Sequence, residues 1–181
     1  MQDAFAAQYL NDVVRQFRQL KELAEKALAQ ISDDEIFIAL DEEGNSIALL
    51  MKHLAGSMRA RWTEFPSDSD EASSRNRDSE FAIDEGDAKR ALIERWEGAW
   101  QCLFTAIEPL TAEDLAKTIL IRGRSLSVIE AINRQLIHYA YHVGQIVFLA
   151  KHLRSSTWQS LSIPRGKSAE FITAARQKRE G

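Results

Sequence analysis

The sequence contains few of the residues that cross-link or interrupt a chain. Its 181 residues include one cysteine, three prolines and eight glycines. The lone cysteine, Cys102, excludes an intramolecular disulfide, which fits a reducing compartment. Its apolar helical surroundings favour a buried small side chain over a nucleophile. The scarcity of proline and glycine permits long uninterrupted helices.

An excess of basic residues and a long hydrophobic run are also absent. With a net charge of −4 and scattered positive charges, the chain has no basic footprint of the kind that binds nucleic acid. The N-terminus has no basic region followed by an apolar one, so we expect no signal peptide. The most apolar stretch, residues 136–149, is shorter than the roughly 18 residues of a spanning helix. We therefore expect a cytoplasmic protein with neither nucleic acid nor membrane as a partner.

What is present is typical of one globular domain. Hydrophobic residues make up 45% of the chain and charged residues 28%, and the length is sufficient to bury a core. Apolar residues recur at spacings of three and four in four segments, which predicts amphipathic helices. These helices are expected over about residues 3–30, 45–65, 85–107 and 127–153. The sequence thus predicts a single all-α domain over residues 1–181, with a core of about 3–153 and a tail of 154–181.

The segments between the helices carry further predictions. Residues 66–84 are polar and long for a loop, and such loops are often functional. Residues 111–114 resemble a short capped turn of helix. Residues 118–127 alternate weakly around Gly123, which favours a small hairpin or an extended crossover. The tail is expected to wrap the bundle and to end in a frayed helix.

The last predicted helix is apolar nearly all round. Such a helix is buried on most sides, so it is either the central helix of the bundle or part of a dimer interface as well. Its apolar surface exceeds what one packed face requires. We therefore expect a homodimer.

A polar stripe runs through this apolar helix, formed by Gln135, His138, His142 and Gln145. At about 100° per residue, His138 and His142 lie on one face, one turn apart. Buried polar groups are costly unless they find partners. Two histidines four residues apart on a helix can chelate one metal ion. The alternative is a pair of hydrogen-bonded core histidines.

A third metal ligand must come from another element, and His53 on the second predicted helix is the candidate. Its face carries mostly small residues, so a neighbouring helix can come close or a pocket can open. Three neutral imidazoles with open positions left over form the ligand set of catalytic zinc sites, and this set also suits nickel or ferrous iron. The remaining histidine, His152, lies ten residues beyond His142, roughly 15 Å along the helix, and is expected at the surface.

These residues resemble a known family. A histidine in the second helix, a long spacer and residues 138–146 (HYAYHVGQI) look like the DinB-like superfamily. One branch, labelled only as a domain of unknown function, carries similar patterns in three further places. They are residues 51–56 (MKHLAG), 75–78 (RNRD) and 161–166 (LSIPRG). The resemblance covers about residues 45–170, most of the chain.

The resemblance implies an up-down-down-up four-helix bundle, often dimeric, with a metal held by three histidines on helices two and four. Better-understood members include metal-dependent transferases that use low-molecular-weight thiols such as bacillithiol, mycothiol or glutathione. By resemblance, the ion would bind the thiol and favour its thiolate, which is the nucleophile. The thiolate would attack an electrophile such as an epoxide or alkyl halide.

Three further residues are candidates for binding a substrate. Arg75 and Arg77 lie in the long loop after the second helix. They either bind a carboxylate of a thiol cofactor or substrate, or form salt bridges in a loop that closes over the bundle end. Gln145, one turn past His142, either orients a ligand histidine or bound water, or forms a hydrogen bond across a dimer axis.

The leading functional hypothesis is a divalent-metal-binding protein that acts as a thiol S-transferase on small electrophiles. The alternative is a non-enzymatic, dimeric metal-binding or stress-response bundle. An accessible pocket separates the two, because an enzyme needs an open coordination position facing a cleft of several hundred Å³. A structural site would be closed by a fourth protein ligand.

Overall fold

The computed structural model describes residues 2–66, 75–121 and 123–171. This part of the chain is mostly helical, as the sequence predicts. Four long helices are α1 (Gln2–Leu28), α2 (Ile47–Trp62), α3 (Lys89–Ile107) and α5 (Val128–Arg154). The shorter elements are η1 (Glu35–Phe37), η3 (Asp78–Phe81), α4 (Ala112–Ala116), β1 (Thr118–Ile121), β2 (Arg124–Ser127) and η4 (Ser155–Thr157). Among the described residues, no helix combines the length and apolar character needed to cross a bilayer.

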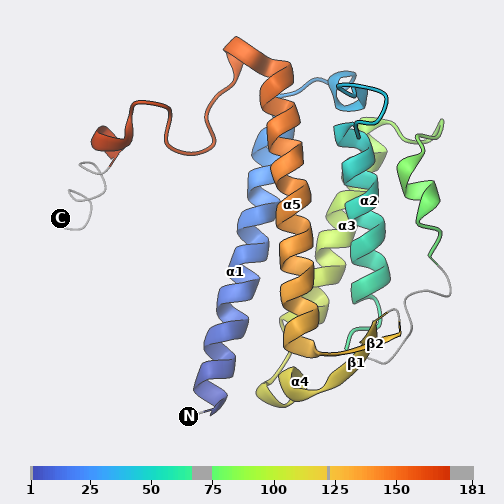
Figure 1. Ribbon diagram of the computed structural model, residues 1–181, viewed down its shortest axis with the longest axis vertical. Coiled ribbons are helices and arrows are strands. Elements are labelled where there is room, and N and C mark those ends of the chain that lie inside the picture. The colour runs from blue at the N-terminus through green and yellow to red at the C-terminus, as the bar shows by residue number, and fades with distance from the viewer. Residues whose placement is uncertain (1, 67–74, 122, 172–181) are drawn as a thin grey trace.

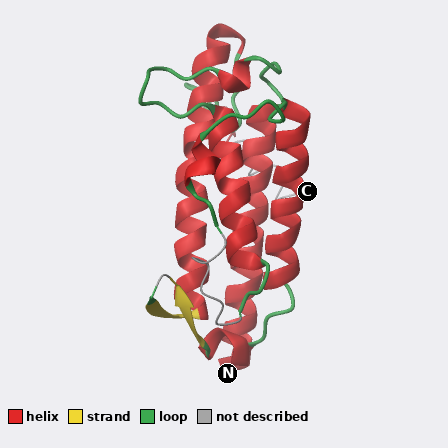
Figure 2. Cartoon of the chain, turned by 90° about the vertical axis from the view of Figure 1, so that its right-hand side faces the viewer, coloured by secondary structure: helices red, strands yellow, loops and turns green. Residues whose placement is uncertain are grey.

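The long helices lie side by side along the molecule (Figure 1). α1 packs against α5, α2 packs against α3, and α2 also contacts α5. α1 and α5 begin at the end of the molecule that carries the hairpin, whereas α2 and α3 begin at the opposite end (Figure 1). Figure 2 shows the same helices from the side, with the hairpin confined to one end. Two helices far apart in the sequence, α2 and α5, therefore run antiparallel and face each other.

Side-chain caps fix where the helices begin. The Ser46 hydroxyl accepts a hydrogen bond from the Leu49 backbone N–H, so α2 starts where the sequence predicts. At the start of α5, the Ser127 hydroxyl accepts from the Glu130 N–H, and the Glu130 carboxylate accepts from the Ser127 N–H at 2.7 Å. This reciprocal capping box satisfies two backbone donors that the helix itself leaves unpaired.

The start of α3 differs from the prediction by four residues, because α3 begins at Lys89 and not near residue 85. The buried carboxylate of Asp87 accepts from the Asp84 backbone N–H at 2.9 Å and from Lys52 Nζ at 2.7 Å. The Asp87 N–H donates to the Asp84 carbonyl. These bonds hold residues 84–87 in a turn and delay the helix.

Residues 118–121 and 124–127 pair as the strands of a hairpin, the first of the two structures that the sequence favours here. The strands are antiparallel, with Thr118 opposite Ser127 and Ile121 opposite Arg124. Gly123 has φ 72°, a left-handed conformation that glycine adopts without steric cost. The Val128 N–H donates to the Lys117 carbonyl. The hairpin therefore closes one end of the bundle and leads directly into α5.

The bundle core contains one large aromatic ring from each long helix: Phe17, Trp62, Trp100 and Tyr139, each no more than 1% exposed. The Phe17 ring centroid lies 6.3 Å from that of Trp62 and 5.8 Å from that of Tyr139. The Trp100 and Tyr139 centroids are 6.0 Å apart. Trp62 Nε1 donates a hydrogen bond of 2.9 Å to the Tyr139 hydroxyl. This bond joins α2 to α5 inside the core.

Two expectations about the surface need correction. The tail contacts the end of α1, where the Gln159 N–H donates to Gln30 Oε1, but its described residues 162–171 are exposed and extend sideways (Figure 1). It does not wrap the bundle there, because its apolar side chains Ile163 and Phe171 find no buried place. α5 is also not a central helix, because only one side of it is buried in the single chain. Its outer face exposes an apolar stripe of Ile137, Tyr141 and Phe148. The alternative, that this outer face belongs to a dimer interface, stays a prediction.

We expect Tyr139→Phe to lower the free energy of unfolding by about 1–3 kcal/mol, because the buried Trp62 N–H would lose its acceptor. Urea denaturation measures this change. Tyr141→Phe is the matched control, since Tyr141 is 62% exposed, and it should stay within about 0.5 kcal/mol of the wild type. Equal stability of the two variants would contradict the assigned role of the bond.

Candidate metal centre

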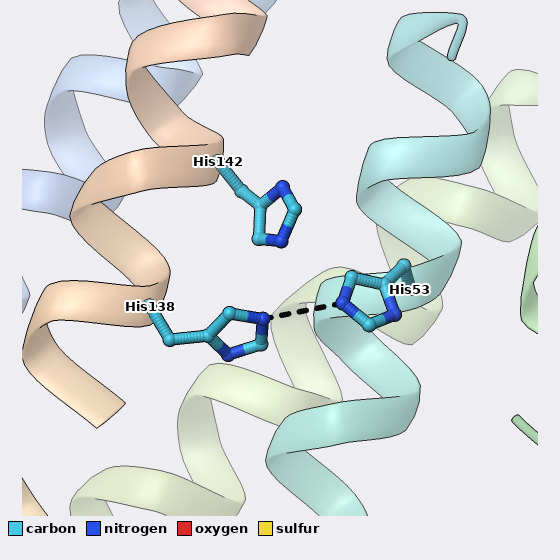
Figure 3. Close-up of side chains that lie close together, drawn as sticks. All are labelled: His53, His138 and His142. Carbon is cyan, nitrogen blue, oxygen red and sulfur yellow. Dashed lines mark hydrogen bonds between the residues drawn. The ribbon is translucent and has the colours of Figure 1, made fainter. Parts of the chain in front are cut away.

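Three histidines from two helices converge in the space between α2 and α5. His53 is buried on α2, and His138 and His142 are half-buried on α5. One ring nitrogen from each lies within 4.8 Å of the other two. The Nε2 atoms of His53 and His138 are 3.2 Å apart (Figure 3). The three rings point toward one another (Figure 3), as the sequence predicts for a shared ligand set.

Core packing sets this convergence. Tyr139 points into the aromatic core, and successive residues of a helix are rotated by about 100°. The neighbouring His138, and His142 one turn later, therefore lie at the flank of α5 that faces α2. The Trp62–Tyr139 hydrogen bond fixes α2 against the same flank, which brings His53 opposite the pair.

A buried carboxylate orients His53. Its Nδ1 lies 2.8 Å from Oε2 of Glu80, a residue of η3 that is 6% exposed. Arg75 donates to both carboxylate oxygens of Glu80, at 2.7 and 2.8 Å. Burial alone would raise the pKa of Glu80, but the hydrogen bonds from His53 and Arg75 outweigh it and the pKa is lowered. An ionised Glu80 accepts from the Nδ1–H of His53, which leaves the Nε2 lone pair for a ligand.

An amide orients His142. Its Nδ1 lies 2.7 Å from Oε1 of Gln145, so Nδ1–H donates and Nε2 is the nitrogen left for a ligand. Burial lowers the pKa of His142, and electrostatic interaction with the nearby His53 and Arg77 lowers it further, against the opposing effect of the Gln145 bond. The neutral imidazole is thereby favoured, which is the form that binds a metal.

The donor set fits a divalent transition metal. Three imidazoles suit zinc, nickel and ferrous iron, and at least one coordination position remains for water or a ligand. Within the described residues, the group holds His53, His138 and His142 and gains no fourth histidine, cysteine or carboxylate. Glu80 is hydrogen-bonded to Nδ1 of His53, whereas Nε2 of the same ring faces the other histidines. Glu80 therefore orients His53 and is not a metal ligand itself.

The three histidines open into a cleft of about 430 Å³. Phe81 lines it beside His53, with ring centroids 4.8 Å apart, and Tyr141 lines it from α5. A volume of this size is within the range of small-molecule sites. The cleft provides the accessible pocket that distinguishes an open site from a closed one.

The three candidate substrate-binding residues all line this cleft. Arg75 holds Glu80, so its guanidinium serves the support of His53. The exposed Arg77 lies over the Phe81 ring, 4.8 Å from its centroid. Gln145 orients His142, one of the roles considered for it. Direct contact of these residues with a substrate stays a prediction.

Glu80 is the residue that sequence reasoning missed. A signal for it is Gly56, one turn past His53 on the same helix: a Cβ there would lie 2.7 Å from Glu80 Cδ. The small residues beside His53 indicate a close neighbour, but their pattern does not say that the neighbour is a carboxylate. His152, by contrast, is exposed as predicted and stacks on Phe148, away from the cleft.

The fold and the site define a helical bundle with a three-histidine group facing an open cleft. The family model described as "Protein of unknown function (DUF1572)" matches residues 4–167, and the chain belongs to that family. The matched range includes all three histidines and Glu80. No curated protein and no solved structure matches the chain.

We expect Gly56→Ala to displace Glu80 and to destabilise the fold by about 1–3 kcal/mol, because the added methyl group has no room. Gly144→Ala on α5 is the matched control: nothing lies within 4 Å of a Cβ there, so better helix propensity should stabilise by about 0.5–1 kcal/mol. Urea denaturation of both variants measures the difference. A stabilising Gly56→Ala would refute the close approach of Glu80.

Proposed function

We propose that this chain binds one divalent transition metal, zinc, nickel or ferrous iron, through His53, His138 and His142. The observation that carries the proposal is the convergence of three ring nitrogens within 4.8 Å at the wall of an open cleft. We further propose that the protein is a DinB-like up-down-down-up bundle. The histidine positions on α2 and α5 and the directions of the four long helices support this assignment.

We propose thiol S-transfer to a small electrophile as the reaction. When bound, a divalent cation at a thiol sulfur lowers the thiol pKa, so that the nucleophilic thiolate prevails near neutral pH. The chain's own residues orient and support this centre: Glu80 and Gln145 each hold an Nδ1–H, so that Nε2 of His53 and of His142 faces the cleft. The cleft walls hold the small-molecule ligand. We assign no protein residue as a catalytic acid or base.

The open cleft and the three-residue ligand set support an enzyme over a closed structural site. The alternative, a non-enzymatic metal-binding or stress-response bundle, uses the same histidines without turnover. The two proposals differ only in the chemistry at the open position. They are therefore separated by an activity measurement on metal-loaded protein.

The metal site is tested by elemental analysis of untagged protein purified without chelator. We expect about one ion per chain in the wild type and its loss in His138→Ala, because two imidazoles rarely suffice as ligands. His152→Ala is the matched control, since His152 is exposed and away from the cleft, and should keep its metal. A wild type that takes up neither zinc, nickel nor iron would refute the site.

The reaction is tested on the same preparations with bacillithiol, mycothiol and glutathione against epoxide and alkyl halide substrates. We expect conjugation by the loaded wild type and His152→Ala, and none by His138→Ala. Loaded wild-type protein that conjugates none of these pairs would favour the non-enzymatic alternative.

We also propose a homodimer formed through the α5 apolar stripe. Ile137, Tyr141 and Phe148 are 71%, 62% and 62% exposed in the single chain, and contiguous exposed apolar surface marks interaction sites. Sedimentation should give twice the chain mass of 20.5 kDa for the wild type and a monomer for Ile137→Asp. The control Ile83→Asp, at a 45% exposed isoleucine outside the stripe, should stay dimeric. A monomeric wild type would overturn the proposal.

A further inference from the structure

The charged side chains that line the cleft beside the three histidines are all cationic. They are four arginines, of which Arg75 is paired with Glu80, and none of the described lining residues carries a carboxylate. The whole chain has the opposite sign, with a net charge of −4. The positive lining is therefore a local feature of the cleft. A cleft lined by one sign of charge concentrates ligands of the other sign.

The charge extends toward the hairpin-side end of the cleft. Arg134 and Gln135 precede His138 on α5 by four and three residues, and Arg61 lies on α2 beyond His53. All three line the cleft, together with Ile121 of the hairpin. At 1.5 Å per residue, Arg134 lies about 6 Å along the helix from His138. The polar groups at this end are thus within reach of one small molecule that also contacts the histidines.

The arginines of the cleft differ in the hydrogen bonds and ion pairs that their side chains form within the protein. Arg75 binds Glu80 through two nitrogens. Among the described residues, the Arg134 side chain makes no hydrogen bond or ion pair. Its guanidinium is exposed at the cleft and presents a fork of N–H donors.

Gln135 supplies an independent observation. Its side chain lines the cleft and is only 7% exposed, and its Oε1 is buried without a hydrogen-bond partner in the part of the chain described. Buried polar side chains in native proteins are generally paired. An amide oxygen accepts hydrogen bonds and does not donate them. Rotation of the amide by 180° about its terminal bond exchanges Oε1 and Nε2, so that the side chain presents an N–H donor to an anionic ligand.

We infer that Arg134 and Gln135 form an oxyanion subsite, which takes the carboxylate or phosphate of a small-molecule ligand in the same cleft as the three-histidine group. This inference deepens the proposed function, since it gives the charge and polarity of the ligand. The Arg134 fork donates to two oxygens of a planar or tetrahedral anion. With its amide turned so that Nε2–H faces the ligand, Gln135 donates a further hydrogen bond, and Arg61 adds positive charge from α2. Carboxylate and phosphate share this chemistry.

The test is calorimetric titration with two probes, succinate and inorganic phosphate, on the full chain as purified and after metal removal. We expect saturable binding of at least one probe, weakened about tenfold by Arg134→Gln because a charge-assisted pair of hydrogen bonds is lost. Gln135→Met should also weaken binding, since it keeps the side-chain length and removes the amide. Tighter binding of succinate identifies a carboxylate ligand, and tighter binding of phosphate a phosphorylated one.

Arg90→Gln is the matched control, because the Arg90 side chain is 91% exposed on α3, outside the cleft, and it should bind both probes as the wild type does. Circular dichroism verifies that each variant is folded. Absence of binding in the wild type, or equal binding by Arg134→Gln and Arg90→Gln, would overturn the subsite. The metal content of the same samples distinguishes the two proposals. Anion binding without metal uptake refutes the metal site alone. Metal uptake without anion binding refutes the oxyanion subsite alone.

Discussion

The aromatic layer in the core is the constraint on which the rest of the site depends. One ring from each long helix meets there, and the Trp62–Tyr139 hydrogen bond joins α2 to α5 across it. A packed helix could still rotate about its own axis, and burying a large aromatic ring on one face fixes that rotation. Once Tyr139 points inward, its neighbour His138 has to lie at the flank facing α2. The same packing that stabilises the bundle therefore sets the directions of the histidines.

A buried hydrogen-bond network orients His53 within the three-histidine group. Glu80 and Arg75 come from the segment between α2 and α3, and Gly56 leaves the space that the Glu80 side chain fills. A buried carboxylate is costly unless it is paired, and here two partners lower its pKa despite burial. The carboxylate in turn fixes the tautomer and the direction of His53. Such support is a common feature of metal-binding histidines.

The chemical character of the cleft follows from which residues these helices bring to it. Neutral imidazoles offer lone pairs to a cation, whereas the surrounding arginines repel cations and attract anions. The two preferences are compatible when one ligand carries both an atom that coordinates a metal and an oxyanion at some distance from it. The proposed thiol chemistry and the proposed oxyanion subsite are linked in this way, although each rests on its own residues.

Periodicity in the sequence determined the presence of the four long helices and of two histidines on one face of α5, because these depend on residues close in the chain. The pairing of His53 with them came from resemblance and residue type, and the fold brings the three together. Glu80, the cation-lined cleft, the exposed face of α5 and the course of the tail were decided only by the tertiary structure. They depend on contacts between residues far apart in the sequence, such as His53 with Glu80 and with His138, and local pattern carries no information about which distant side chains meet.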